Sequence, residues 1–206
     1  MYHPRRISVI LLLAAACAPA LQPLPPMAPL PLPVRESPPS TQMRPRPDSS
    51  RGVEFDVLLA RGLMVPVAGI SSSQIADSYD APREGGRRHE ALDIVAPRNT
   101  PVLAADDGVI LRIGSNTLGG NVIWATDAAR RFTYYYAHLD HYAPGLRESQ
   151  RVARGDLLAY VGTTGNAPAD SPHLHFQAMR NLENRRFSDG LPFNPKPFFT
   201  NPGVAR

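Results

Sequence analysis

The chain has very little cysteine, tryptophan or lysine. Among its 206 residues, Cys17 is the only cysteine, Trp124 the only tryptophan and Lys196 the only lysine, so the other 21 of the 22 basic residues are arginines. One cysteine cannot form an internal disulfide, which excludes a disulfide-stapled fold. Long apolar runs are also missing: the N-terminal run at residues 7–16 is too short for a mature membrane-spanning helix, which needs about 20 residues.

The chain also lacks a concentrated basic region. It has 22 basic and 18 acidic residues and a net charge of +4, and Arg5 and Arg6 lie in the N-terminal segment. The other arginines occur in ones and twos, without a long run and without interleaved aromatic residues. This pattern argues against nucleic acid as a partner.

The first residues have the layout of a secretory signal peptide. Two arginines precede the apolar run at residues 7–16, and small residues follow it. We therefore expect residues 1–16 to be removed and the protein to be exported.

Cys17 directly follows Leu13-Ala14-Ala15-Ala16 at the end of this run, and the segment resembles a bacterial lipobox. The resemblance implies cleavage after Ala16 and a lipid anchor on Cys17, which would become the first mature residue. Ala18 follows the cysteine in place of aspartate, which in lipoproteins of Gram-negative type favours the outer membrane, facing the periplasm. The alternative is a soluble secreted or periplasmic protein in which Cys17 is incidental.

Residues 17–50 form a proline-rich segment. Eleven of the 23 prolines fall between Pro19 and Pro47, which excludes helix interiors and sheet ladders and favours extended polyproline II. We expect a disordered, semi-rigid linker of about 3.1 Å per residue. A second interpretation is a proline-rich ligand for a partner domain.

Residues 51–206 contain the mixture of aliphatic, glycine and aromatic residues that can build a core. Residues 53–62 predict a short lead-in helix, because apolar positions are spaced along one face and glycine follows. Short apolar runs then predict strands at residues 65–70, 91–95, 100–105, 108–114, 121–126, 131–139, 157–162 and 173–179. The fold class is therefore all-β, with mainly antiparallel strands in a sandwich or a partly closed sheet.

Turn residues separate several of these runs. Asp107-Gly108, Leu118-Gly119-Gly120-Asn121 and Arg154-Gly155-Asp156 stand at spacings that predict antiparallel hairpins.

Four of the six histidines occur in three compact patterns, which are His89-x-x-x-Asp93, Ala137-His138 and His173-Leu174-His175. Imidazole nitrogen and carboxylate oxygen suit zinc, and three protein ligands leave a tetrahedral position open for water, as in catalytic sites. In a strand, His173 and His175 share one face and can therefore share a cleft.

The same alternation places Tyr134 and Tyr136 on one face with His138, which makes both tyrosines candidates to line a substrate cleft. His141 is expected to be a solvated loop histidine.

Longer segments around these patterns resemble the lysostaphin/LytM-type zinc endopeptidases, which cut peptide bonds in bacterial peptidoglycan. The resemblance runs from Val65 to about Phe198. Its motifs are SYDAPREGGRRHEALDIVAP, PVLAADDGVI, YYYAHLDHY and GDLLAYVGTTGNAPADSPHLHF.

This resemblance implies a LytM-type metallopeptidase domain with an antiparallel duplicated-hybrid-motif fold. It makes His89, Asp93 and His175 the ligands of one zinc ion, and His138 and His173 the catalytic histidines. Zinc would activate water to hydrolyse peptide cross-links of peptidoglycan. The two histidines would take up the proton of that water or stabilise the oxyanion.

Two positions depart from the family pattern. Ala91 stands where glycine is usual, which would strain the backbone if this position had a positive φ, and Gln177 stands where glutamate is frequent.

Two other functions stay open, a non-catalytic LytM-type activator of a cell-wall amidase and a lipoprotein that binds cell-wall peptide without turnover. The presence of all five site residues argues against the activator. D-Ala–diaminopimelate cross-links are the expected substrate ahead of glycyl bridges, and the sequence names no regulatory protein partner.

Overall fold

The structure is a computed structural model that describes residues 49–200. The expected signal peptide, the proposed lipidation site Cys17 and all but the last two residues of the expected linker lie outside this range. No helix within residues 49–200 is long and apolar enough to cross a membrane.

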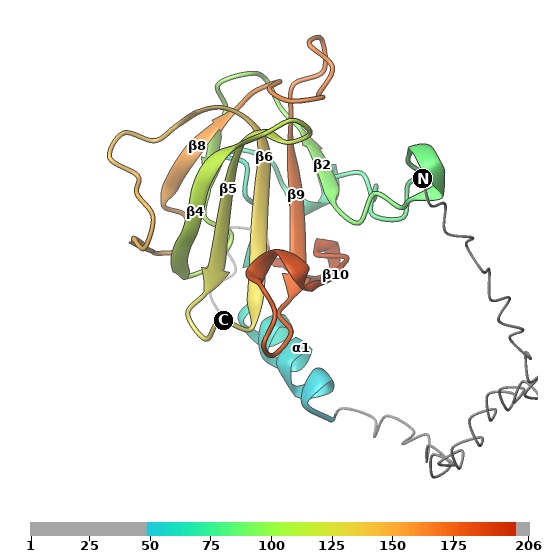
Figure 1. Cartoon of the computed structure of the whole chain (residues 1–206), viewed down its shortest axis with the longest axis vertical. Coiled ribbons are helices and arrows are strands. Elements are labelled where there is room, and N and C mark those ends of the chain that lie inside the picture. The colour runs from blue at the N-terminus through green and yellow to red at the C-terminus, as the bar shows by residue number, and fades with distance from the viewer. Residues whose placement is uncertain (1–48, 201–206) are drawn as a thin grey trace, which may run out of the picture. The chain divides into compact units, whose positions relative to one another are not determined.

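One α-helix, α1 (Ser49–Arg61), precedes the strands and lies at one end of the sheet (Figure 1). It packs on the hydrophobic core through Leu58, which is fully buried, and through Phe55. The Phe55 ring lies 5.0–5.8 Å, between centroids, from the rings of Phe132, Phe193 and Phe198. Gly62 ends the helix at φ 68°, a left-handed conformation that glycine adopts without steric cost. The predicted lead-in helix is confirmed, and it begins four residues earlier than expected.

The strands that follow are short. They are β1 (Leu63–Met64), β2 (Leu92–Val95), β3 (Pro101–Leu103), β4 (Gly108–Asn116), β5 (Gly120–Asp127), β6 (Phe132–Tyr142), β7 (Arg151–Val152), β8 (Leu157–Val161), β9 (His173–Arg180), β10 (Leu191–Phe193) and β11 (Phe199–Thr200). Four 3₁₀ turns lie between them in the described range: η1 (Ser72–Gln74), η2 (Glu84–Gly86), η3 (Phe187–Asp189) and η4 (Lys196–Phe198).

Within residues 49–200, nine of these strands form one antiparallel sheet with the main order β10-β9-β6-β5-β4-β7. β2 adds to β9, and β8 joins β3 to β6, while β1 and β11 form a separate parallel pair. Figure 1 shows β4, β5, β6 and β9 side by side. The predicted all-β, mainly antiparallel fold class is confirmed.

Three details of the sequence prediction are wrong. Residues 65–70 form no strand and make one isolated bridge, Val67 to Val102, because Pro66 has no N–H to donate and Gly69 turns the chain at φ 76°. Asp107-Gly108 does not close a hairpin, since β3 pairs with β8 and β4 pairs with β5 and β7. The turn at residues 154–156 likewise joins β7 to β8, which do not pair.

Gly108 is needed for packing instead. A Cβ atom at this position would lie 1.8 Å from the carbonyl oxygen of Thr126 on β5. Glycine thus permits close approach of two strands and is not a mark of a turn here. The turn between Asn116 and Gly120 does join paired strands, β4 and β5, as predicted.

β9 divides the two faces of the sheet. From Leu174 to Ala178 its even-numbered residues are fully buried in the core: Leu174, Phe176 and Ala178. From His173 to Gln177 its odd-numbered residues line a groove on the opposite face: His173, His175 and Gln177. Strand alternation therefore separates core from groove along β9, as the sequence predicts.

β6 changes partner halfway along its length. Its first half pairs with β9, whereas Leu139 and Tyr142 pair with β8. Its register against β5 shifts by one residue between Tyr136 and Leu139, and His138 in this bulge has φ 61°. A bulge inserts one extra residue and re-aims the side chains after it, so His138 emerges on the face of Tyr135 and not on that of Tyr136.

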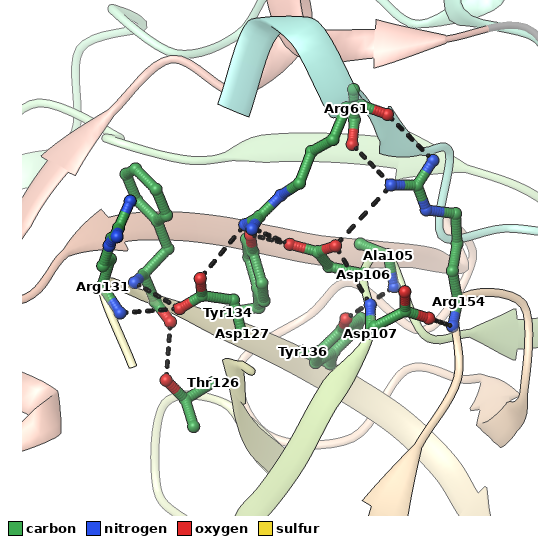
Figure 2. A network of polar contacts seen from close by, with 12 residues as sticks. Arg61, Ala105, Asp106, Asp107, Thr126, Asp127, Arg131, Tyr134, Tyr136 and Arg154 are labelled. Carbon is green, nitrogen blue, oxygen red and sulfur yellow. Dashed lines mark hydrogen bonds and ion pairs between the residues drawn. The ribbon is translucent and has the colours of Figure 1, made fainter. Parts of the chain in front are cut away.

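A buried polar network joins α1 to the sheet (Figure 2). Arg61, the last helical residue, pairs with Asp106 and Asp127 at N–O distances of 2.5 and 3.2 Å. The Arg154 guanidinium donates to the carbonyl oxygens of Arg61 and the residue after it, at 3.1 and 3.0 Å. The Tyr134 hydroxyl donates to Asp106 at 2.8 Å. Each buried carboxylate in this network therefore has a cationic partner.

Candidate metal centre and active site

Three predicted site residues meet where β2 pairs with β9. Asp93 lies directly opposite His175 in the antiparallel register, and His89 precedes β2. His89 Nε2 lies 3.0 Å from His175 Nδ1 and 3.0 Å from Asp93 Oδ1, and the last two atoms are 3.1 Å apart. Ligand atoms bound to tetrahedral zinc at about 2.0–2.1 Å lie about 3.3 Å from one another. The triangle therefore has nearly the size of one face of a zinc tetrahedron.

The segment before β2 orients this triangle. The Nδ1 of His89 donates to the carbonyl oxygen of Ser78 at 2.9 Å. The Ser78 hydroxyl accepts the backbone N–H of Asp93 at 3.0 Å. Arg83 donates to Asp93 Oδ2, the carboxylate oxygen outside the triangle, at 2.7 Å. Ser78 and Arg83 thus fix both the ring and the carboxylate.

The donor atoms fit a divalent cation. Because His89 Nδ1 donates to a carbonyl, the Nε2 of the neutral ring carries a lone pair, and this lone pair faces the carboxylate of Asp93. Burial opposes ionisation of Asp93, but its contacts with His175 and His89 outweigh this effect and hold the pKa of this carboxyl well below its usual value. Burial also lowers the pKa of His175. A cation between the three atoms would satisfy them all, and two imidazoles with one carboxylate suit zinc.

His138 and His173 lie beside the triangle. Their ring centroids are 4.9 Å apart, and His173 Nε2 lies 3.7 Å from Asp93 Oδ1. His138 Nδ1 donates to the carbonyl of Thr164 at 2.9 Å, and His173 Nδ1 donates to that of Ser171 at 2.8 Å. Each neutral ring therefore carries its lone pair on Nε2.

Burial lowers the pKa of His138 to about 4, and the neighbouring His173 and His175 add to this effect. His138 is therefore neutral at neutral pH and can accept a proton.

All five residues line one groove of about 840 Å³. Trp124 on β5, Tyr135 on β6 and Gln177 on β9 stand in one row across the sheet, because the register pairs them directly. Trp124 packs on Tyr135 with ring centroids 4.3 Å apart. Residues of the loop before His89 line the same groove.

The expected cleft lining by Tyr134 and Tyr136 is wrong. Both side chains lie in the core, 2% and 1% exposed. The Tyr134 hydroxyl donates to Asp106, and the Tyr136 hydroxyl accepts the N–H of Ala105 at 3.0 Å. The bulge at His138 breaks the alternation, so Tyr135 reaches the groove. His141 is exposed as expected, although it lies in β6, where its ring stacks on Tyr160.

The departure at Ala91 causes no strain. The positive φ in this segment falls on Glu90, at 56°, and Ala91 is not among the residues with positive φ. Ala91 is completely buried, so a small side chain is needed there for packing.

A comparison with protein families identifies this segment. Residues 87–195 match the model of peptidase family M23. The chain belongs to this family. The M23 segment contains all five clustered residues, whereas Ser78 and Arg83 precede it. Sequence reasoning missed these two, since only the folded segment shows that they contact His89 and Asp93.

The relatives are endopeptidases by name. The M23 chain is 34% identical over 124 residues to L-Ala–D-Glu endopeptidase of Bacillus subtilis, covering 57% of this chain and 36% of the relative. It is 34% identical over 121 residues to glycyl-glycine endopeptidase ALE-1 of Staphylococcus capitis, covering 58% and 31%. The chain thus spans about a third of the length of these relatives.

A solved structure of the antimicrobial peptidase lysostaphin from Staphylococcus simulans is also similar. Its TM-score is 0.51 at 29% sequence identity, covering 61% of this M23 chain and 48% of that chain.

Proposed function

We propose that the protein is a zinc-dependent endopeptidase that hydrolyses peptide cross-links of bacterial peptidoglycan. One zinc ion would be held by His89, Asp93 and His175. The observation that carries the proposal is the triangle of three atoms that can bind a metal, 3.0–3.1 Å apart, beside two further histidines in one groove. Membership of family M23 and the endopeptidase names of the relatives support it.

When bound, zinc supplies Lewis-acid polarisation of a peptide carbonyl and lowers the pKa of water. His138 and His173 would accept the proton of the attacking water and pass it on. Both direct Nδ1–H to backbone carbonyls, so both offer the Nε2 lone pair towards the groove. Such a neutral imidazole accepts a proton from water and returns it to the leaving amine.

The groove would hold the substrate peptide across the sheet. Trp124 and Tyr135 provide an aromatic surface in its lining, and the described groove is large enough for several residues of an extended peptide. The relatives' names specify different bonds, so D-Ala–diaminopimelate cross-links are proposed here from the expected Gram-negative envelope.

We place the enzyme at the outer membrane, facing the periplasm, with a lipid on Cys17 and residues 17–50 as its tether; a soluble periplasmic protein is the alternative. Labelling cells with a radioactive fatty acid tests this placement. We expect label on the wild type and none on Cys17→Ser, which should leave the membrane fraction. Equal fractionation of both proteins would contradict the anchor.

Cross-linked muropeptides incubated with the zinc-loaded protein test the activity, with products identified by mass spectrometry. Cleavage should stop with a chelator and return when zinc is added. A folded, zinc-loaded protein that cuts nothing but stimulates an amidase would instead establish the activator role.

A further inference from the structure

We propose that the loop at residues 83–88, here called the arginine loop, binds a carboxylate of the substrate and makes the enzyme selective for anionic over neutral peptides. This inference rests on the proposed endopeptidase function and names the class of peptide that its groove accepts.

The arginine loop contributes three basic side chains to the lining of the groove. Arg83, Arg87 and Arg88 all line the same cavity as the five clustered residues. All three are exposed to solvent. Their long side chains can therefore meet a ligand without displacing core residues.

The backbone of the loop holds a defined shape. The N–H of Arg83 donates to the carbonyl of Arg87 at 2.9 Å, and Pro82 bridges to Arg88. Gly85 and Gly86 have φ of 73° and 74°, two successive left-handed conformations that side-chain-bearing residues rarely adopt. The turn is thus closed by its own hydrogen bond, and its geometry depends on the glycine pair.

The charge balance of the groove favours an anion. Among the side chains that the structure describes, two acidic ones, Glu90 and Asp93, line it together with the three arginines. Asp93 is already engaged through both oxygens, one in the triangle and one with Arg83. A divalent ion in the triangle would add further positive charge next to the arginine loop. Glu90 and Asp80, which pairs with Arg88, do not offset both the arginine loop and the ion.

The existing partner of Arg88 is easily replaced. Arg88 pairs with Asp80 at 3.0 Å, but the two side chains are 71% and 70% exposed, and such solvent-exposed pairs contribute little. Guanidinium groups bind carboxylates through two parallel hydrogen bonds. Since the proposed substrate is a peptide, the anion is a carboxylate within reach of the scissile bond.

Two matched substrates test the proposal: a cross-linked muropeptide with free carboxyl groups and the same compound with these groups converted to carboxamides. The full-length zinc-loaded wild type is compared with the double variant Arg87→Gln/Arg88→Gln. Arg147→Gln is the control, because Arg147 is exposed and does not line the groove. Both kcat and KM are measured.

We expect the wild type to have a lower KM for the carboxylate substrate, and the double variant to lose roughly fivefold or more of that preference, with kcat unchanged. The amidated substrate should respond to neither variant. Equal use of both substrates by the wild type, or an equal loss on both in the double variant, would overturn the proposal.

Binding measured by calorimetry keeps the test independent of turnover. If the wild type cleaves neither substrate, the proposed activity fails, but tighter binding of the carboxylate compound that is lost in the double variant still supports the arginine loop. Equal binding of both compounds overturns it.

Discussion

Two clusters of buried and part-buried polar side chains in the described chain differ in how their charges are matched. In the network around Arg61, each of the two buried carboxylates, Asp106 and Asp127, faces a guanidinium from another part of the chain (Figure 2). In the triangle of His89, Asp93 and His175, Arg83 pairs with the outer carboxylate oxygen of Asp93, but no described protein cation lies between the three atoms that face one another. A matched cluster stabilises the fold, whereas an unmatched one is arranged to bind something. We therefore expect the network around Arg61 to stabilise the fold and the triangle in the groove to bind a ligand.

The largest expected effect comes from removing a member of the unmatched triangle. His175→Ala should reduce muropeptide cleavage by at least ~10⁴-fold, because without zinc neither the carbonyl nor the water is activated. The midpoint of thermal unfolding without metal should stay close to that of the wild type. A large loss of apo stability would show that the triangle is itself a structural cluster.

Asp127→Ala makes the converse change in the matched network. Asp127 is completely buried, pairs with Arg61 and accepts the backbone N–H groups of Arg131 and Phe132 at 2.7 and 2.8 Å. Its removal should lower the free energy of unfolding by about 3 kcal/mol, since these donors lose their partner. Denaturant unfolding measures this loss. Zinc stoichiometry of the folded variant should be unchanged; loss of zinc would break the division between the clusters.

His138→Ala separates zinc binding from proton transfer within the groove. We expect full zinc content and a fall in kcat of about a hundredfold or more, because a positioned acid–base group contributes this much. Metal analysis and steady-state kinetics on the same sample test it. A variant that retains wild-type kcat would exclude His138 from the chemistry.

Ser78→Ala should produce the smallest of these effects. It removes the hydroxyl that accepts the Asp93 N–H but keeps the backbone carbonyl that holds His89. Zinc affinity should fall about tenfold, as for other groups that orient metal ligands. Competition with a chromophoric chelator measures it, with Ser73→Ala as the control because Ser73 is exposed, hydrogen-bonds to the Ser71 hydroxyl and does not line the groove. Equal affinities in the two variants would remove Ser78 from the site.

Much of this arrangement could be predicted from the sequence where local rules hold. Regular alternation along β9 correctly places His173 and His175 on one face. It fails along β6, because the bulge at His138 depends on that strand changing its partner from β9 to β8. Tyr135, and not Tyr134 or Tyr136, therefore reaches the groove. A one-residue bulge has no signature in the run of tyrosines.

The role of a glycine is also hard to predict from the sequence, because a turn and a close contact between strands can both require one. Asp-Gly at residues 107–108 is typical of a hairpin turn, but Gly108 serves close packing against Thr126. Which strands pair is decided by contacts distant in sequence, such as β3 with β8. Ser78 and Arg83 were missed for the same reason, since their contacts with the site follow from the path of the loop before β2.

Zinc titration of three proteins tests the central claim most directly, that three residues hold the ion and two face the substrate. Wild type and His173→Ala should each bind one equivalent of zinc, and His175→Ala should bind none with comparable affinity. An equal loss of zinc in His173→Ala and His175→Ala would contradict the assignment of the His173-Leu174-His175 pair.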